Sequence, residues 1–451
     1  MRHLLLLIVL SCVVINYSLV DRLHIQRDKN ALSAMPSLQG VPPEIIFATT
    51  ALGAFRGLLV DALWLRATSM RDRGEFFELV QLSDWIGKLE PRMPKIWSFN
   101  AWNLAYNISV ELPTSAERWN WVNQGMKVLK EKGIPYNPKC ADLYEELSWI
   151  IYHKIGQYTD DHNNYYKLRL ADEIDRVMGS KSATEILEKY PDMAKRIKDE
   201  LSLDVSFMVE LENRFGFFDW RFPDALAIYW AQKGRPFAKA NTIKNMDRIT
   251  YSGLQNCFRR GRLFIARDDN GNAISFYSVP NFSFVNAVIK LFEANLKSFG
   301  RKVGVVSAYK YFLEEALTTA YIYGDKKTAS IIMLKLQEQF PKDKKYKKSF
   351  NTVAQRLLME GIKEANRDDL YNYITGYLTN AYVHLGWGES EASKQMEFIA
   401  AKLYKYFEKT FQSKGQTLPR FDLLRTQALR QANMILPHKL RMKMELIKKM
   451  E

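Results

Sequence analysis

Two histidines and two aspartates lie close together in the sequence and are its strongest candidates for chemistry: His153, Asp160, Asp161 and His162. Imidazole and carboxylate groups are ligands that zinc and other divalent ions accept, so a turn at Gly156 that brought the four together would create a metal site. The alternative is structural. Thr159 or Asp160 would cap the next helix, Asp161 would favour its positive end, and the histidines would form local hydrogen bonds. We expect the structural role.

An Asp-Trp-Arg sequence at 219–221 is the second candidate site. Arg221 can form a bidentate ion pair with Asp219 while Trp220 fills a core pocket. Pro223 suits the first turn of the next helix, which carries two more aromatic residues. The candidate ligand pocket therefore comprises Asp219, Trp220, Arg221, Tyr229 and Trp230. We rank simple packing of the aromatic residues in the core above a pocket.

The common catalytic signatures are missing from this sequence. It has no phosphate-binding G-x-x-x-x-G-K-[ST], no G-x-S-x-G, no H-E-x-x-H and no EF-hand loop. Its three cysteines (Cys12, Cys140 and Cys257) contain no C-x-x-C, which excludes a disulfide scaffold and a cysteine-based zinc ribbon. We therefore expect a protein that is not an enzyme and has no cofactor.

The composition indicates a large folded protein with an excess of basic residues. Of 451 residues, 47% are hydrophobic and 13% aromatic, which is enough for a core and excludes disorder. The net charge is +15, and basic residues cluster at 259–262, 342–348 and 439–449. We interpret these clusters as solvated faces. In the last of them, an apolar stripe through Leu440 and Met444 could also suit a membrane surface or a partner groove.

A helical-repeat pattern runs from residue 74 to residue 101. It consists of a turn glycine, an aromatic residue, a helix-ending proline, and a tryptophan and a small residue on the next helix: Gly74, Phe76, Pro91, Trp97 and Ala101. Glycine permits the positive φ of a turn between helices, proline ends a helix, and alanine lets helices approach closely. This pattern resembles the tetratricopeptide repeat. It departs from the family at Leu79, where an alanine is usual.

The same pattern returns later in the chain. Pro138 precedes another helix start, and Gly324 is followed by Ala329 and Pro341. The glycine-to-proline distance is the same in both clear copies, since 341 − 324 equals 91 − 74. The expected fold class is therefore all-α: a tetratricopeptide-like helical-repeat solenoid with one N-terminal transmembrane helix and a small β-hairpin insertion.

The rest of the chain also has mostly helical periodicity. Apolar residues three and four apart predict helices over 165–177, 183–201, 224–233, 285–299, 369–385 and 390–411. Residues 262–267 and 273–279 instead predict two strands around an Asn-Gly turn. The expected organisation is a membrane anchor (1–30), a tetratricopeptide-like helical region (31–250), a hairpin with a connecting helix (251–300), and a second helical-repeat region with a basic tail (301–451).

An uncharged apolar run at residues 4–20 predicts a membrane anchor. As a helix it would span roughly 25 Å, enough for a thin bilayer. A cleaved signal peptide would have a shorter apolar region and a small-x-small cleavage site. The apolar run of a lipoprotein signal would end at Cys12, whereas this run continues beyond that residue. We expect a single-pass inner-membrane protein with its body on the periplasmic or extracytoplasmic side, although the basic residues after the run favour the reverse orientation.

Several strings between residues 45 and 300 resemble a family of N-terminally membrane-anchored, tetratricopeptide-like bacterial proteins without established activity. They are WNW (119–121), GIPYN (133–137), HKIG (153–156), DDH (160–162), YYK (165–167), DWRFP (219–223) and IYWA (228–231). The resemblance implies an architecture and no catalytic residues. We expect a scaffold or adaptor that binds other proteins through its helical surface and does not bind nucleic acid. The alternative is a membrane-anchored metal-dependent enzyme or ligand-binding protein that uses the His153–His162 cluster.

Overall fold

The computed structural model describes residues 56–363, 365–411 and 416–450, together with positions 19, 22, 25 and 26. These residues are mostly helical, with one small antiparallel sheet, so the prediction of an all-α fold with a β-hairpin is confirmed. The predicted anchor at residues 4–20 lies almost entirely outside the described residues. Within the described ranges, no helix combines the length and the apolar character needed to cross a membrane.

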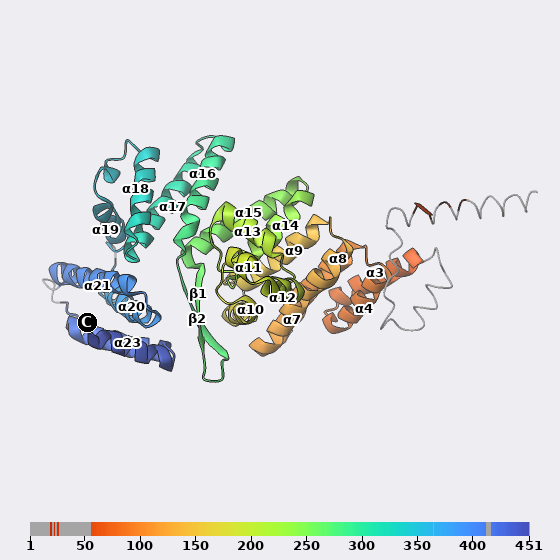
Figure 1. Ribbon diagram of the computed structural model, residues 1–451, viewed down its shortest axis with the longest axis horizontal. Coiled ribbons are helices and arrows are strands. Elements are labelled where there is room, and N and C mark those ends of the chain that lie inside the picture. Colours follow the sequence, from red (N-terminus) through yellow and green to blue (C-terminus); the bar gives the residue numbers. More distant parts are fainter. Residues whose placement is uncertain are drawn as a thin grey trace, which may run out of the picture.

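The helices follow one another along the long axis of an elongated molecule, with α3 and α4 at one end and α18, α19 and α21 at the other (Figure 1). The amino-terminal half contains α3 (Arg56–Asp72), α4 (Phe76–Leu89), α5 (Pro94–Trp102), the π-helical η2 (Asn103–Ile108), α6 (Ser109–Glu111), α7 (Ser115–Lys127), the π-helical η3 (Val128–Gly133), α8 (Ile134–Tyr136), α9 (Ala141–Trp149), the π-helical η4 (Ile150–Gly156), α10 (Asn163–Met178), α11 (Ala183–Lys189), α12 (Pro191–Leu201), α13 (Val205–Phe215), α14 (Pro223–Gly234), η5 (Arg235–Phe237) and α15 (Ala240–Arg260).

The strands β1 (Arg262–Arg267) and β2 (Ala273–Val279) connect this half to the carboxyl-terminal half. That half contains η6 (Phe282–Phe284), α16 (Val285–Phe299), α17 (Val303–Ile322), α18 (Lys326–Gln339), η7 (Lys344–Lys347), α19 (Phe350–Glu360), α20 (Arg367–Trp387), α21 (Ser390–Phe411), α22 (Phe421–Ile435) and α23 (His438–Met450). In α23, Met444 is completely buried, so the apolar stripe of the basic tail is used at least partly in packing within the protein.

Glycines with positive φ separate the helices of two pairs. Gly74, between α3 and α4, has a φ of 76°, and Gly324, between α17 and α18, has a φ of 73°. Each turn is closed by the same backbone bond. Glu75 N–H donates to the carbonyl of Met70 at 3.0 Å, and Asp325 N–H donates to that of Ala320 at 2.9 Å. This bond satisfies a carbonyl at the helix end, and the glycine adopts the left-handed conformation without steric cost.

The other residues of the repeat pattern lie at the boundaries or in the core of these pairs. Pro91 follows α4, Pro341 follows α18, and Pro138 precedes α9, while Phe76 is the first residue of α4. The side chains of Trp97, Ala101, Ala329 and Leu79 are buried. Trp97 Nε1 donates a hydrogen bond to the carbonyl of Pro91 at 2.8 Å, which ties the end of one helix to the next.

A further turn with a glycine of positive φ and the same backbone bond was not predicted. Gly388, with a φ of 88°, separates α20 from α21, and Glu389 N–H donates to the carbonyl of His384 at 2.9 Å. One predicted helix is wrong as a continuous element. Residues 183–201 form two helices, because Pro191 has no N–H to donate and its ring clashes with the preceding turn. The second helix, α12, starts at this proline, where the missing donor costs nothing.

The hairpin lies between the two helical halves (Figure 1). Its strands have the predicted bounds, and Gly271 in the turn has a φ of 83°. The ring centroids of Phe264 and Trp387 are 5.0 Å apart, and Tyr277 Oη lies 2.9 Å from His384 Nε2, so the hairpin packs on α20. It is attached to α10 by charged side chains on the other side. The hairpin therefore joins the halves and is not an isolated sheet.

Candidate functional site

The structure does not assemble the predicted metal site. Asp160 Oδ2 forms a buried ion pair with Lys154 Nζ at 2.5 Å, and Asp160 Oδ1 accepts the backbone N–H of His162 at 2.8 Å. Burial has the largest single effect and would raise the pKa of Asp160, but the hydrogen bonds from Lys154 and from the His162 N–H, together with the charges of Lys154 and Arg118, lower the pKa below its usual value. In the described part of the chain, no group of three or more His, Cys, Asp or Glu side chains is arranged to hold a metal ion.

The two histidines have other partners instead, and the expectation of local hydrogen bonds is wrong, because Tyr106 and Ser115 each lie 47 residues away from the histidine they contact. The ring of His153 stacks on Trp149 with centroids 4.7 Å apart, and its Nδ1 lies 3.3 Å from Tyr106 Oη. His162 Nδ1 lies 2.7 Å from Ser115 Oγ. Burial, with a smaller effect of Lys154, lowers the pKa of His153 and favours its neutral form. The helix cap was misplaced by the sequence-based expectation, because the residue before α10 is His162 and not Thr159 or Asp160.

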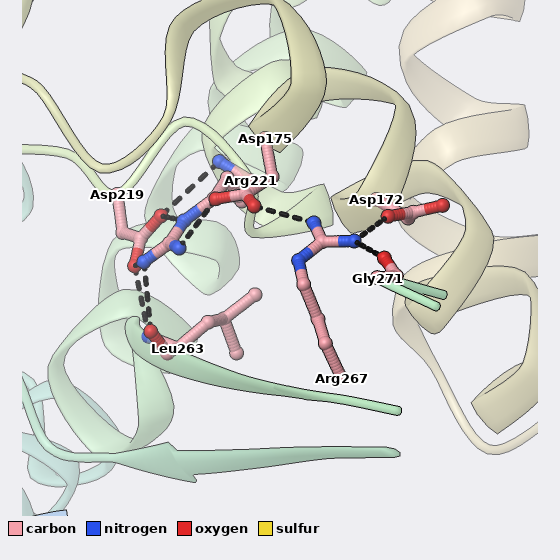
Figure 2. Close-up of polar contacts among 7 residues, drawn as sticks. All are labelled: Asp172, Asp175, Asp219, Arg221, Leu263, Arg267 and Gly271. Atoms are coloured by element: carbon pink, nitrogen blue, oxygen red, sulfur yellow. Dashed lines mark hydrogen bonds and ion pairs between the residues drawn. The ribbon is translucent and has the colours of Figure 1, made fainter. Parts of the chain in front are cut away.

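Arg221 is the centre of a charged network that includes the predicted ion pair (Figure 2). Its Nε donates to Asp219 Oδ1 at 2.8 Å and its Nη2 donates to Asp219 Oδ2 at 2.9 Å. Its Nη1 donates to Asp175 Oδ1 of α10 at 2.9 Å. Burial alone would lower the pKa of Arg221, but the two carboxylates raise it overall. The guanidinium therefore remains charged and fully paired.

The same network holds the hairpin on α10. Asp219 Oδ2 accepts the backbone N–H of Leu263 at 2.8 Å, and Arg221 Nη2 donates to the carbonyl of Leu263 at 2.7 Å. From the same strand, Arg267 donates to Asp172 Oδ1 at 2.7 Å and to Asp175 Oδ2 at 2.5 Å. The two bonds to Leu263 satisfy backbone groups that an edge strand would otherwise leave unpaired. The network has a structural role.

Four of the five residues of the predicted pocket are buried, and Asp219 is half-buried. Trp220, Tyr229 and Trp230 are buried, with exposed fractions of 2%, 1% and 6%. Trp220 Nε1 donates to Glu212 Oε1 at 2.8 Å, and Tyr229 Oη accepts the backbone N–H of Asp204, also at 2.8 Å. Asp219 and Arg221 do line an open cavity of about 590 Å³, but their charges are paired with each other. The aromatic residues therefore do not form a pocket.

A different set of aromatic side chains forms a partly exposed strip across α3, α5–η2 and α9–η4. We call it the aromatic face; its residues are Trp64, Phe99, Trp102, Tyr106, Trp149 and His153. Ring centroids are 5.1 Å apart for Trp64 and Phe99, 4.2 Å for Trp102 and Tyr106, 5.9 Å for Tyr106 and His153, and 4.7 Å for His153 and Trp149. None of the six side chains is fully buried, and Trp102 is 42% exposed.

The segment α5–η2 carries two apolar stripes, and the second one produces this face. Its core stripe includes Trp97 and Ala101, whereas Phe99, Trp102 and Tyr106 follow one another at spacings of three and four along a separate line. A helix that packs on one side only needs one such stripe. The second stripe is the signal in the sequence that we did not use. Tyr106 and His153 also lie on π-helical segments, which are frequent at functional sites.

A cavity of about 430 Å³ opens beside the aromatic face. It is lined by Arg71, Phe76, Ser98, Phe99, Trp102, Asn103, Asn107 and Glu146. Glu146 Oε1 is buried and has no hydrogen-bond partner among the described residues. Burial, and to a lesser extent the charge of Glu145, raises the pKa of Glu146 to about 7. Aromatic rings beside a polar cavity are suited to binding a ligand, because the rings provide apolar contact area and attract cations.

The chain matches no protein-family model, no curated protein and no solved structure in the comparisons. The resemblance to an anchored tetratricopeptide-like family therefore stays a prediction.

Proposed function

We propose that this chain is a membrane-anchored helical-repeat adaptor that binds a segment of another protein on the aromatic face. The observation that carries this proposal is the set of partly exposed rings on three helical segments, next to a cavity. Aromatic side chains provide large contact areas at a low entropic cost and are enriched at protein interfaces. Most of these rings also pack against the core with part of their surface, and the remainder of each ring is left open to a partner.

The repeat geometry supports a tetratricopeptide-like solenoid. The α3–α4 and α17–α18 pairs have the same glycine-to-proline spacing and the same turn hydrogen bond from Glu75 and from Asp325. In stacked helix pairs, one helix of each pair contributes to an extended concave surface that binds partners. α5 contacts both α4 and α9, as expected for successive pairs. We assign α3, α5 and α9, which carry the aromatic face, to that surface.

The membrane part of the proposal rests on the sequence. The apolar run at residues 4–20 would anchor the chain in the inner membrane with its body on the periplasmic or extracytoplasmic side. The partner would then be another protein in that compartment or in the same membrane. Nucleic acid is not an expected partner, since an exported body would not meet it.

Capture from the native membrane with matched variants tests this function. The double variant Phe99→Ala, Trp102→Ala removes two rings of the aromatic face, and Tyr311→Ala removes an exposed ring, 68% accessible, from α17. Proteins that bind the face should be recovered with the wild type and with Tyr311→Ala, and at least tenfold less with the double variant. Melting temperatures should show that all three chains are folded. Recovery of the same proteins in equal amounts with all three would contradict the proposal.

A further inference from the structure

We propose that the cavity beside the aromatic face binds a positively charged lysine or arginine side chain of the partner, and that Glu146 is its counter-charge. This inference rests on the proposed function and specifies the chemistry of the partner segment. It is carried by a carboxyl group without a partner, by the rings beside it and by the shape of the cavity.

Glu146 is the unpaired acid of this region. It lines the cavity from α9, its Oε1 is buried, and it has no hydrogen-bond partner among the described residues. Its neighbour Glu145 differs, because Glu145 Oε1 accepts a hydrogen bond from Asn245 at 2.7 Å. Leaving a carboxylate buried without a partner is costly, and a bound cation would remove that cost. The cavity therefore favours a cationic ligand over an apolar or acidic one.

The aromatic rings suit the same ligand. Phe99 and Trp102 line the cavity together with Glu146. Cations bind over the faces of aromatic rings, and tryptophan is the strongest of these acceptors. The surface already holds one guanidinium in this way, since Arg71 lies 5.9 Å from the centroid of Phe99. Arg71 is also paired with Asp72, at 2.9 Å, so its charge is already balanced and it does not satisfy Glu146.

The side chain of the partner would enter between the rings and place its charged end on the carboxylate. Lysine and arginine have apolar stems that pack on rings while their heads form charge-assisted hydrogen bonds. Asn107 lines the same cavity; its Nδ2 donates to Asn103 Oδ1 at 3.0 Å, and its Oδ1 can accept a hydrogen bond from the backbone of the partner. The predicted partner segment therefore presents a basic residue in an accessible loop or helix.

Fluorine NMR of the full-length chain in detergent, labelled with 5-fluorotryptophan, tests this inference. The signal of Trp102 is identified by its loss in Trp102→Phe. The probes are N-acetyl-arginine amide and N-acetyl-lysine amide, and their uncharged counterparts are N-acetyl-citrulline amide and N-acetyl-norleucine amide. The variants are Glu146→Gln, which keeps the size of the side chain, and the matched control Glu145→Gln, which removes a neighbouring carboxylate that already has a partner.

We expect the two cationic probes to shift the Trp102 signal saturably and the two uncharged probes to have little effect. Binding should be at least tenfold weaker in Glu146→Gln and should not be weakened in Glu145→Gln. The inference is overturned by equal shifts with charged and uncharged probes, by unchanged binding in Glu146→Gln, or by no shift with any probe. If it fails while partner capture still depends on Phe99 and Trp102, the adaptor function stands and only the cationic partner is excluded.

Discussion

Asp219 and Leu263 are 44 residues apart in the sequence, yet the carboxylate of Asp219 accepts the backbone N–H of Leu263 at 2.8 Å. Arg221 completes the arrangement by donating to the carbonyl of the same residue. One ion pair thus occupies the position that a neighbouring strand would take at the edge of β1. The pair links the two halves of the molecule through the hairpin and protects an edge from non-specific pairing.

Arg221→Ala should destabilise the hairpin strongly. The substitution leaves Asp219 and Asp175 close together without their shared counter-charge, which typically costs about 3–5 kcal/mol for a buried pair. The control is Arg235→Ala, because the Arg235–Asp247 pair is exposed, with side-chain exposures of 42% and 46%, and should contribute about 1 kcal/mol or less. Hydrogen exchange of the β1 amides measures the difference. Equal protection of β1 in the two variants would show that the network does not hold the strand.

Gly74→Val should destabilise the α3–α4 turn by about 1–3 kcal/mol, and Gly74→Asn by less. A Cβ at Gly74 would meet nothing closer than Phe76 Cε2 at 4.0 Å, so the cost comes from the positive φ and not from a clash. Gly376→Ala is the control, since Gly376 lies inside α20 with open space around it and alanine should stabilise by up to about 1 kcal/mol. Melting temperatures measure both effects. Identical values for the wild type and both Gly74 variants would refute the left-handed turn.

Glu146 should make stability fall as pH rises. Its pKa in the folded chain is about 7, above the ordinary value of 4.5, so the folded chain binds more protons than the unfolded chain between these values. The stabilising contribution is therefore complete below about pH 4.5 and is lost as pH rises through 7. Glu146→Gln removes this dependence, so its melting temperature relative to wild type should be higher at pH 8 than at pH 5. A difference that does not change with pH would contradict a buried, unpaired carboxyl.

Removing residues 1–30 should yield a soluble, folded body, because the apolar run at residues 4–20 would be gone. The intact chain should resist extraction from membranes by high salt and by alkaline carbonate. Mass spectrometry of the native protein provides the control for cleavage. A shortened, salt-extractable form would show that the leader is removed and that the chain is not anchored by it.

Local patterns in the sequence predicted the hairpin and most of the helices. The bounds of β1 and β2 followed from two short strands around an Asn-Gly turn, which specifies its own register. Gly74 and Gly324 could be predicted as turn residues, because glycine adopts a positive φ without the steric cost that other residues have. Pro191 was overlooked within a strong apolar periodicity, although proline inside a helix reliably breaks it.

Features that depend on contacts between distant residues could not be predicted in this way. His153 and His162 have the residue types of a metal site, but their Nδ1 atoms lie 3.3 Å from Tyr106 Oη and 2.7 Å from Ser115 Oγ, each 47 residues away in the sequence. The second aromatic stripe of α5–η2 is visible in the sequence, but only the tertiary packing shows that its rings are partly exposed. The π-helical segments have no simple sequence signal either.

The central claim is that a protein partner contacts the aromatic face, and site-specific photocrosslinking tests it most directly. Benzoylphenylalanine replaces Trp102 in one full-length chain and Tyr311 in another, and both chains are irradiated in their native membranes. The proposal predicts discrete crosslinked products containing another protein from position 102 and none of these products from position 311. No protein product from position 102, or the same products from both positions, would contradict it.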